Sequence, residues 1–449
     1  MIQSSIAGDT LVKLVESIES GIRNGALSPG EKLPPIRVVA SSLGLSPATV
    51  AGAYQQLQRR GFLVSQGRRG TIVSARPPLP LALPPLSGEG LINCATGNPD
   101  RRLLPKLGPA LSAVRRTHAL YDEEAPHPEL LRLGRQRFRE DQVPADAIGV
   151  ANGSLDGIER ALAERLRPGD RIAVEDPCFT GILDLIRSRG FVPVPVALDP
   201  SGILPASLTE ALKLKPRALI VTPRAQNPSG AAFTRDRVAE LKPILKKAPD
   251  LFVIEDDHAG PISGVPYHGL CDEQTRHWTV VRSLCKSFGP DLRIALQTGD
   301  AETLANVQGR QQLGIRWVSH FLQDMAVHFL TDPTTCRQLE RASDLYSERR
   351  QALITPLRTA GLPAWGRSGL NVWVPVPDET RVAQSLQAAG FLVSAGARFR
   401  LQSTPALRIT VASLKPKEAG TGRRPKQEIR PPAGTGRPWF RPERAPTHS

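Results

Sequence analysis

The sequence predicts an α/β protein in which a small, basic helical unit precedes a large domain with a mostly parallel, doubly wound sheet. Apolar runs such as "RIAVED", "PRALIVTP", "LFVIEDD" and "WTVVRSL" alternate with helical periods such as "SLTEALKLK". Strands interleaved with helices favour a parallel sheet covered on both faces. A proline-rich stretch separates this region from a helix-turn-helix pattern near the amino terminus. The length of 449 residues also exceeds one compact core, so two or three folding units are expected.

The composition is that of a globular protein with two basic ends. Hydrophobic residues make up 40% and charged residues 22% of the chain, and no window approaches the roughly 20 apolar residues that span a bilayer. The opening "MIQSSIAGDT" lacks a signal-peptide pattern, so we expect a cytoplasmic protein without a membrane partner. The formal net charge is +15, and residues 1–76 hold nine Lys and Arg against four Asp and Glu. Basic ends attract polyanions such as DNA.

The cysteines suggest neither a disulfide framework nor a metal site. The chain has five of them: Cys94, Cys178, Cys271, Cys285 and Cys336. Their number is odd, and no C-x-x-C pair occurs among them. We therefore expect reduced thiols and no metal.

Composition divides the chain into four segments. Residues 1–75 form the basic unit, and the proline-rich residues 76–90 are expected to be an extended linker. A proline-rich loop inside one domain is the alternative. Residues 91–414 carry the α/β pattern, and residues 415–449 are rich in Gly, Pro and Arg, which predicts a disordered basic tail.

The amino-terminal unit has the pattern of a winged helix-turn-helix. "TLVKLVESIESGIRNGAL" predicts an amphipathic helix, and a second helix, a turn at Gly44 and a third helix follow. Ser46 suits the N-cap of that third helix, and Pro47 suits its first position. "FLVSQGRRGTIVS" predicts a hairpin with Arg68 and Arg69 at its tip. A helical hairpin that binds nothing is the alternative, but paired arginines at a turn favour contact with DNA.

This unit resembles the DNA-binding domain of the GntR family over nearly all of residues 8–75, in "LSPGEKLPPIRVVASSLGLSPATVAGAYQQLQRRGFLVSQGRRGTIV". The resemblance implies a set of DNA-contacting residues: Arg37, Ser46, Thr49, Arg68, Arg69 and Gly70. Pro47 departs from the family, which often has arginine there.

Unusual polar residues follow the predicted strands, where ligands bind in parallel sheets. Lys286 stands in "VVRSLCKSFGPDLRIAL" between two apolar runs, and Arg293 follows seven residues later. For a lysine taken alone, a surface turn is the simpler interpretation. "ANGSLDGIERAL" offers the backbone amides of Gly153, Ser154 and Leu155 before a helix, where they can hold a phosphate.

Three more strand ends bear on Lys286. Phe179 in "VEDPCFTG" can stack on a flat ring, although a core phenylalanine is the alternative. Asn227 in "TPRAQNPSG" carries an amide donor. "VIEDDHAG" ends in Asp256 and Asp257, followed by His258.

A lysine amine, an aspartate, a phosphate cradle and an aromatic plate together meet the requirements of pyridoxal 5'-phosphate. Lys286 would form a Schiff base with the aldehyde, and an aspartate would keep the pyridine nitrogen protonated. Arg293, Ser283 and the amides of residues 153–155 would neutralise the phosphate. We therefore predict pyridoxal 5'-phosphate as the cofactor.

The order of "NPSG", "DD" followed by histidine, "SLCK" and "PDLR" resembles the fold type I aminotransferases along residues 90–414. The resemblance implies that Asn227 and His258 face the phenolic oxygen of the cofactor and Asp256 its nitrogen. It also implies that Arg408 in "LRITVAS" binds a substrate carboxylate.

The same resemblance implies a homodimer in which Tyr121 reaches the phosphate in the partner subunit. The choice of Asp256 over Asp257 depends on register alone. His258 stands where tyrosine is usual in that family, and Phe179 stands where tyrosine or tryptophan often lies.

A winged helix joined to an aminotransferase-like domain resembles the MocR subfamily of GntR regulators, and most of all regulators of vitamin B6 metabolism of the PtsJ type. The resemblance implies a transcriptional regulator that binds operator DNA. Its effector would be pyridoxal 5'-phosphate, a related vitamer, an amine or an amino acid. The alternative is a working aminotransferase with a vestigial DNA-binding unit, and a plain DNA-binding structural protein is third. We expect little or no turnover at Lys286.

Overall fold

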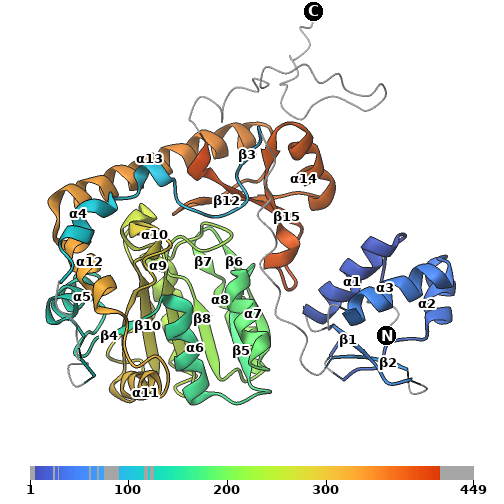
Figure 1. The fold of residues 1–449 in the computed structure, drawn as a ribbon, viewed down its shortest axis with the longest axis horizontal. Helices are drawn as coiled ribbons and strands as arrows, with labels where there is room; N and C mark the ends of the chain where they lie inside the picture. Colours follow the sequence, from blue (N-terminus) through green and yellow to red (C-terminus); the bar gives the residue numbers. More distant parts are fainter. Residues whose placement is uncertain are drawn as a thin grey trace, which may run out of the picture. The chain divides into compact units, whose positions relative to one another are not determined.

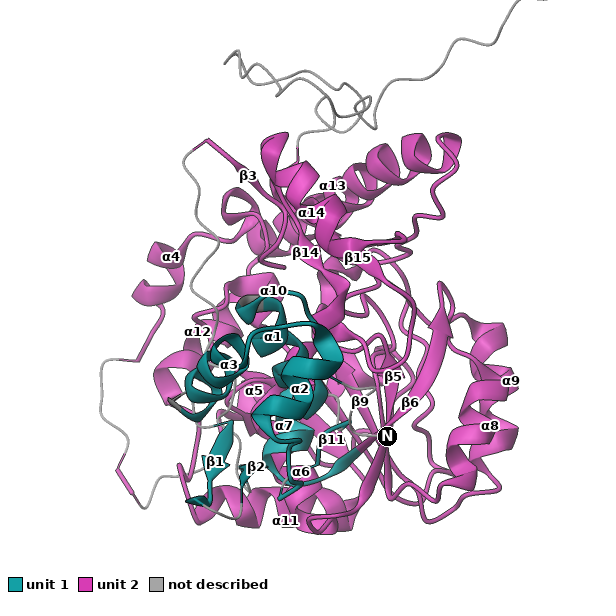
Figure 2. Cartoon of the chain, turned by 90° about the vertical axis from the view of Figure 1, so that its right-hand side faces the viewer, with its two compact units in different colours: residues 1–84, 184–192 teal, residues 85–183, 193–449 magenta. Residues whose placement is uncertain are grey.

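The computed structural model describes most of the chain in two compact units, which Figure 2 colours separately. The described residues are 6–23, 26–28, 30–59, 62–67, 70–74, 90–115, 120–121 and 126–414. The predicted linker, apart from Gly90, and the predicted tail at residues 415–449 lie outside them. No described helix is both long and apolar enough to cross a membrane.

The amino-terminal unit is a winged helix-turn-helix, as predicted (Figure 1). Its elements are α1 (Leu11–Arg23), α2 (Ile36–Leu43), α3 (Pro47–Arg59), β1 (Leu63–Ser65) and β2 (Thr71–Val73). Gly44 ends α2 in the left-handed conformation, with φ of 66°, which a residue without Cβ adopts readily. β1 and β2 pair antiparallel, and the backbone of Lys32 bridges to Ile72 beside them. A core that includes Leu14, Ile18, Val50 and Leu57 holds these elements together.

The large unit contains an eight-stranded sheet in the order β4-β11-β10-β9-β8-β5-β6-β7. The strands are β4 (Gly149–Ala151), β5 (Arg171–Asp176), β6 (Val192–Asp199), β7 (Gly202–Ile203), β8 (Ala218–Val221), β9 (Phe252–Asp257), β10 (Trp278–Ser283) and β11 (Ala295–Gly299). β5, β8, β9 and β10 pair parallel, in the four runs that were predicted as strands.

β11 departs from the parallel pattern because it pairs antiparallel with both β10 and β4. Only the segment 284–294, with the one-turn helix α10 (Cys285–Phe288), joins β10 to β11. A parallel connection needs a crossover of a dozen or more residues, so this short segment turns the chain back. The turn carries Lys286 and Arg293.

Helices surround the sheet (Figure 1). They are α4 (Leu107–Ser112), α5 (Pro128–Glu140), α6 (Ser154–Arg165), α7 (Thr180–Ser188), α8 (Pro205–Lys213), α9 (Arg235–Leu245), α11 (Ala301–Gln312) and α12 (His320–Thr331). α6 packs against α11 and against β10, and α8 packs against α9. The core beneath them contains Val and Leu from the central strands, including Leu219, Val253 and Val280, and Phe from the surrounding helices.

A smaller part of the same unit lies at the carboxyl-terminal end of the described chain. It contains α13 (Pro333–Thr359), α14 (Glu379–Ala388) and the antiparallel sheet β12 (Asn371–Pro375), β15 (Ala406–Thr410) and β14 (Ser394–Ala395). β13 (Phe391–Leu392) pairs parallel with β3 (Ile92–Asn93). The Thr410 amide also donates to the Cys94 carbonyl at 2.8 Å. The loop after β3 therefore lies beside β15, more than 300 residues away in sequence.

Candidate functional sites

The predicted cofactor residues of this unit gather at the carboxyl edge of the sheet. Asn227 follows β8, His258 follows β9, and Lys286 follows β10. Gly153, Ser154 and Leu155 stand between β4 and the first turn of α6, and Phe179 follows β5. Parallel strands all present their carboxyl ends at one edge, so residues spread over more than 130 positions meet there.

Lys286 lies in the single turn of α10, half-buried, and its Nζ donates to the carbonyl oxygen of Gly97 at 2.5 Å. Burial, aided by the positive charge of Arg408, lowers the pKa of this lysine to about 8. A lysine with a lowered pKa has a larger neutral fraction near neutrality, and the neutral amine is the nucleophile towards an aldehyde.

The two adjacent carboxylates of β9 lie in different surroundings. Asp257 forms buried ion pairs with Arg224 at 2.8 Å and with Arg282 at 2.6 Å. Although burial opposes it, the charges of these two arginines hold the pKa of Asp257 well below its usual range. Asp256 has a buried Oδ1 without a hydrogen-bond partner, and burial raises its pKa to about 7 against a hydrogen bond from Ser154. Asp256 therefore has unused capacity to bind a ligand, whereas Asp257 is occupied.

His258 is held neutral at this edge. Burial, aided by the charge of Lys286, lowers the pKa of His258 to about 4. The imidazole therefore offers one donor and one acceptor nitrogen at neutral pH.

A guanidinium covers the amino terminus of α6. Gly153 has φ of 89°, and a Cβ at this position would lie 2.6 Å from Nη2 of Arg293. Only glycine accepts both this backbone conformation and this close approach. Arg293 is solvent-exposed, and its Nη1 also lies 3.6 Å from the thiol of Cys285. Backbone amides at a helix start together with an arginine make a cradle for an anionic group.

Phe179 and Ser283 complete this edge. Phe179 is half-buried, and its ring lies against Gly181, where a Cβ would come within 2.6 Å of Cε1 and within 3.1 Å of Leu155. It is not part of the apolar core of the sheet. The hydroxyl of Ser283 is buried and accepts a hydrogen bond from the Cys285 amide at 3.2 Å.

Arg408 on β15 is a buried cation without a carboxylate partner in the described part of the chain. It is 5% exposed, and its guanidinium lies 4.7 Å from the ring centre of Phe399. Nη1 donates to Oδ1 of Asn227 at 3.1 Å, Nη2 donates to the Ala95 carbonyl, and Nε is buried without a partner. Burial, with a contribution from the charge of Arg398, lowers the pKa of Arg408 to about 9. A buried guanidinium without a carboxylate partner is stabilised by a bound anion, so this position favours an anionic ligand.

The sequence reasoning missed three residues that contact this group. Ala95 and Gly97 lie in "ATGNPD" after β3, and Asn371 begins β12. Gly97 has φ of 69°, and a Cβ there would lie 3.3 Å from Nη1 of Arg408. The position of Gly97 between Thr96 and Asn98 could have indicated a tight turn there. Nothing in the sequence pattern distinguishes Asn371.

Tyr121 does not join this group within one chain. Its side chain is 74% exposed, and its ring packs edge-on against Trp317 at 5.9 Å and beneath Arg316 at 5.3 Å.

In the amino-terminal unit, the predicted DNA contacts lie on α2, at the start of α3 and at the hairpin. Arg37 is exposed on α2. The hydroxyl of Ser46 caps α3 by accepting from the Thr49 amide at 3.0 Å, and it lies 2.8 Å from the Thr49 hydroxyl. Gly70 ends the hairpin turn with φ of 102°. Arg68 and Arg69 lie outside the described residues.

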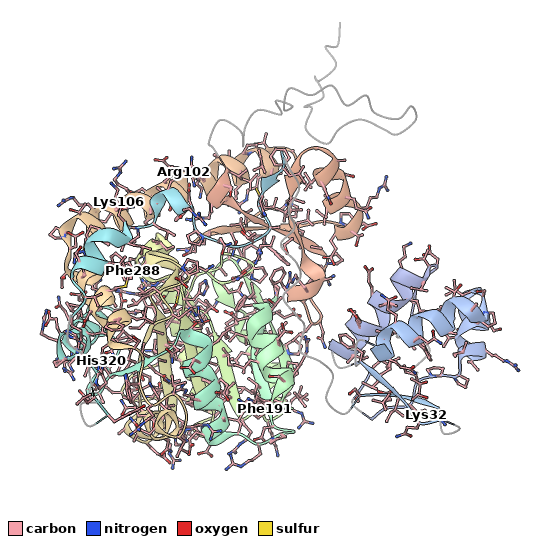
Figure 3. The ribbon with its side chains drawn as sticks, viewed as in Figure 1. Lys32, Arg102, Lys106, Phe191, Phe288 and His320 are labelled. Atoms are coloured by element: carbon pink, nitrogen blue, oxygen red, sulfur yellow. The ribbon has the colours of Figure 1, made fainter. Side chains whose placement is uncertain are left out.

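Lys32 is a further basic residue at the hairpin that the sequence did not indicate. It is exposed, and a Cβ on Gly70 would lie 2.8 Å from its Cε, so its side chain crosses the hairpin at Gly70. Figure 3 labels Lys32 beside the two strands.

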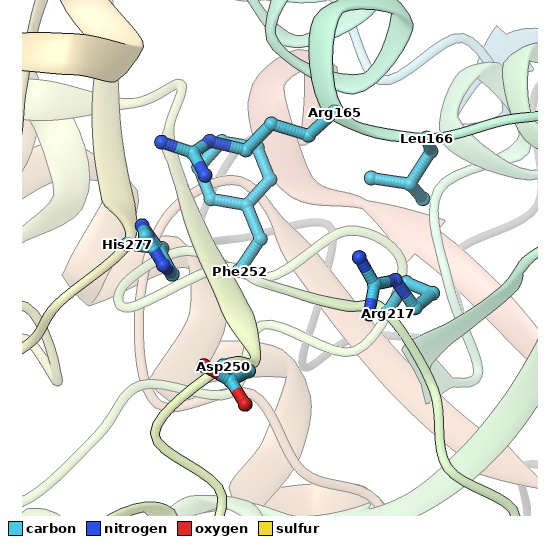
Figure 4. A pocket seen from close by; sticks show the side chains of 6 residues that line it. All are labelled: Arg165, Leu166, Arg217, Asp250, Phe252 and His277. Atoms are coloured by element: carbon cyan, nitrogen blue, oxygen red, sulfur yellow. The ribbon is translucent and has the colours of Figure 1, made fainter.

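A cavity of about 280 Å³ lies at the opposite edge of the sheet (Figure 4). Its lining residues are Arg165, Leu166, Arg217, Asp250, Phe252 and His277. Arg217, Asp250 and His277 precede β8, β9 and β10, so the cavity is at the amino ends of these strands, away from the predicted cofactor residues.

One cluster of possible metal ligands occurs among the described residues, close to that cavity: His277, Asp300 and Glu302. Arg165 pairs with Glu302 at 3.1 Å and approaches Asp300 at 3.5 Å. This guanidinium already pairs with both carboxylates and offsets part of their charge, so we assign no metal here.

Comparison with family models identifies both units. The model "Bacterial regulatory proteins, gntR family" matches residues 11–73, and the model "Aminotransferase class I and II" matches residues 91–421. The second match covers more than half of the chain.

Curated relatives match most of this chain. A vitamin B6 salvage pathway transcriptional repressor, PtsJ of Salmonella typhimurium, is 37% identical over 424 residues, which cover 93% of this chain and 97% of the relative. The pyridoxine biosynthesis regulator PdxR of Corynebacterium glutamicum is 28% identical over 75% of this chain and 76% of its own. A probable rhizopine catabolism regulator, MocR of Rhizobium meliloti, is 25% identical, and the match covers 77% of this chain and 76% of the relative.

Solved structures agree on the fold of the large unit. Kynurenine aminotransferase of Pyrococcus horikoshii superposes with a TM-score of 0.66 at 19% identity, covering 74% of this chain and 88% of its own. Aspartate aminotransferase of Thermus thermophilus with maleate superposes with a TM-score of 0.61 at 20% identity, and the match covers 88% of this chain and 96% of that structure. The chain belongs to the GntR-family transcriptional regulators whose second unit is a class I and II aminotransferase-like domain, the architecture of the MocR-type regulators.

Proposed function

We propose that this regulator holds pyridoxal 5'-phosphate on Lys286 and that occupancy of this site changes its affinity for operator DNA. The observation that carries the proposal is the set of polar groups that gather at one edge of the sheet. Lys286 has a lowered pKa, Asp256 has a buried oxygen without a partner, and Arg293 lies over Gly153 at the start of α6. Structural polar groups are normally paired when buried, so the free oxygen of Asp256 favours a ligand beside Lys286.

The residues present fit the chemistry of this cofactor. Lys286 would bind the aldehyde carbon, and Asp256 would share a proton with the ring nitrogen in a hydrogen bond. When bound, the cofactor supplies a ring that withdraws electrons from the atoms attached to its aldehyde carbon. Asn227 and the neutral His258 would lie at the phenolic oxygen, and Phe179 would lie along a face of the ring.

The phosphate of the cofactor would occupy the cradle at the start of α6. Arg293 supplies the positive charge, and the amides of Ser154 and Leu155 and the hydroxyl of Ser283 supply hydrogen-bond donors. The names of two relatives, a vitamin B6 salvage repressor and a pyridoxine biosynthesis regulator, support a B6 vitamer as the effector.

We also propose that the large unit forms a homodimer. Several large apolar side chains are exposed on it: Leu107, Leu111, Leu120, Tyr121, Leu313, Ile315 and Phe321. Leu313 is 88% exposed, and its exposure costs free energy in a monomer. A second copy would cover these side chains, and the exposed Tyr121 would then reach the phosphate in the partner subunit.

A transaminating enzyme is the second candidate, and the buried Arg408 is the observation that favours it. An arginine without a carboxylate partner suits the carboxylate of an amino acid. A carboxylate-bearing effector would use the same residue, so only turnover separates the two functions.

Operator binding with and without the cofactor tests the proposal. The full chain is titrated against its upstream DNA with and without pyridoxal 5'-phosphate, beside Lys286→Ala and the control Lys242→Ala. Lys242 lies on α9, paired with Asp272 at 2.7 Å. We expect the cofactor to change the affinity of the wild type and the Lys242 variant by about 5- to 150-fold, and that of Lys286→Ala much less. Equal affinities together with multiple turnovers in a transamination assay would instead establish an enzyme.

A further inference from the structure

Two carboxamides from different parts of the large unit meet beside Arg408. Asn227 begins the "NPSG" turn after β8, and Asn371 is the first residue of β12. Nδ2 of Asn371 lies 3.4 Å from Oδ1 of Asn227, and the same oxygen accepts from Nη1 of Arg408 at 3.1 Å. Asn371 is 6% exposed, and its own Oδ1 accepts from the hydroxyl of Thr410 at 2.9 Å.

The orientation of both carboxamides follows from the arginine. A guanidinium only donates, so the atom of Asn227 that faces Arg408 must be oxygen. The atom of Asn371 that faces this oxygen must then be nitrogen, which leaves the oxygen of Asn371 for the Thr410 hydroxyl. One arginine thus determines every donor and acceptor in the chain of contacts, and the Asn227 NH₂ is left to donate elsewhere.

The backbone holds Asn371 firmly in this place. A Cβ on Gly230, the last residue of the "NPSG" turn, would lie 2.5 Å from the carbonyl oxygen of Asn371. The Gly230 carbonyl in turn accepts from the amides of Arg367 at 2.8 Å and Ser368 at 2.9 Å. The turn that carries Asn227 is therefore docked on the segment that carries Asn371.

We infer that Asn371 is a positioning residue that keeps the Asn227 NH₂ directed at the phenolic oxygen of the bound cofactor. A carboxylate at Arg408 would compete for Nη1, because the guanidinium has no carboxylate partner of its own among the described residues. Asn371 would then be the remaining donor to Oδ1 of Asn227. The carboxylate subsite and the cofactor oxygen are thus linked through Asn371. This inference rests on the proposed function.

The test measures the visible absorption band of the lysine-bound cofactor against pH, with and without maleate, a dicarboxylate that has no amine. The variants are Asn371→Ala and Asn371→Asp, and the control is Asn306→Ala, which removes the carboxamide of a half-buried residue on α11. An oxygen that loses an amide donor holds the neighbouring imine proton more tightly. We therefore expect the pH midpoint of the band to rise by about half a unit or more in both Asn371 variants. A shift of this size corresponds to the loss of one hydrogen bond.

Maleate should enlarge this rise in Asn371→Ala, because it draws Arg408 away from Asn227, while the Asn306 control behaves as wild type. Thr410→Val should give a smaller rise and Thr410→Ser none, so a folding defect in one variant leaves the inference testable. Wild-type midpoints in the Asn371 variants, with and without maleate, would overturn the inference alone. A wild-type protein that forms no band and no borohydride-fixed adduct would overturn the proposed function together with it.

Discussion

Asp256 and Asp257 are neighbours at the end of β9, yet Asp257 forms two buried ion pairs and Asp256 forms none among the described residues. Successive side chains of a strand point to opposite faces, so a single step in sequence separates the two surroundings. Asp257 meets Arg224 and Arg282, and Asp256 keeps a buried oxygen without a partner. This relationship gives the two residues distinct, testable roles.

The first prediction concerns stability. Asp257→Asn should lower the free energy of unfolding of the large unit by up to about 3–5 kcal/mol, because it leaves two buried guanidinium groups with only the partly exposed Asp141 as counter-charge. Asp256→Asn should cost far less, since Asp256 forms no ion pair among the described residues and its buried Oδ1 has no hydrogen-bond partner. Denaturant unfolding followed by tryptophan fluorescence reports this unit, because every tryptophan lies beyond residue 90. Equal losses in the two variants would contradict the assignment.

The pH dependence of stability should distinguish Asp256 in the cofactor-free protein. Its pKa rises from 3.8 to about 7 in the fold, so the folded state retains a proton that the unfolded state releases between these values. The stabilising contribution of this group is therefore fully present below pH 3.8 and is lost as pH rises towards 7. The slope of the unfolding free energy against pH reports the difference in bound protons between the two states, and Asp256→Asn should reduce that difference by up to about one proton. Thermal unfolding of both proteins from pH 4 to 8 measures the difference.

Gly153→Ala should weaken cofactor binding by about tenfold or more without unfolding the protein. The new methyl group would lie 2.6 Å from Nη2 of Arg293 and would need a left-handed backbone, a strain of about 1–3 kcal/mol. Gly169→Ala is the matched control, because Gly169 has a similar φ of 96° but no atom within 4 Å of the added Cβ. Absorbance titration with pyridoxal 5'-phosphate measures affinity. Equal losses in both variants would mean that backbone strain, rather than the displaced arginine, is responsible.

The hairpin of the amino-terminal unit should contribute phosphate contacts. Replacing Arg68 and Arg69 with alanine should lower the salt dependence of operator binding by up to about two units, and Lys32→Ala by about one, at roughly 0.9 per phosphate. Lys13→Ala is the control, since Lys13 is paired with Asp9 at 2.9 Å on α1. Binding is followed by fluorescence anisotropy across salt concentrations. An unchanged slope in the hairpin variants would exclude a phosphate role.

Local patterns in the sequence carried much of the prediction. The strands predicted from "RIAVED" and "LFVIEDD" are present because apolar β-branched runs of that length suit a sheet buried on both faces. The N-cap at Ser46 and the turn at Gly44 follow from backbone chemistry that acts within four residues. The proposed cofactor residues Asn227, His258 and Lys286 were identifiable because each one follows a recognisable strand.

Contacts between distant segments were decided only by the tertiary structure. The apolar pattern of the strand does not show which of Asp256 and Asp257 forms ion pairs, because the arginines that pair with Asp257 come from other segments of the chain. The direction of β11 depends on how short the preceding connection is, and its strand pattern alone does not show that direction. Asn371 meets Asn227 from 144 positions away. Sequence therefore determined the elements and the chemistry at their ends, whereas packing of remote elements decided which charges have a partner and which do not.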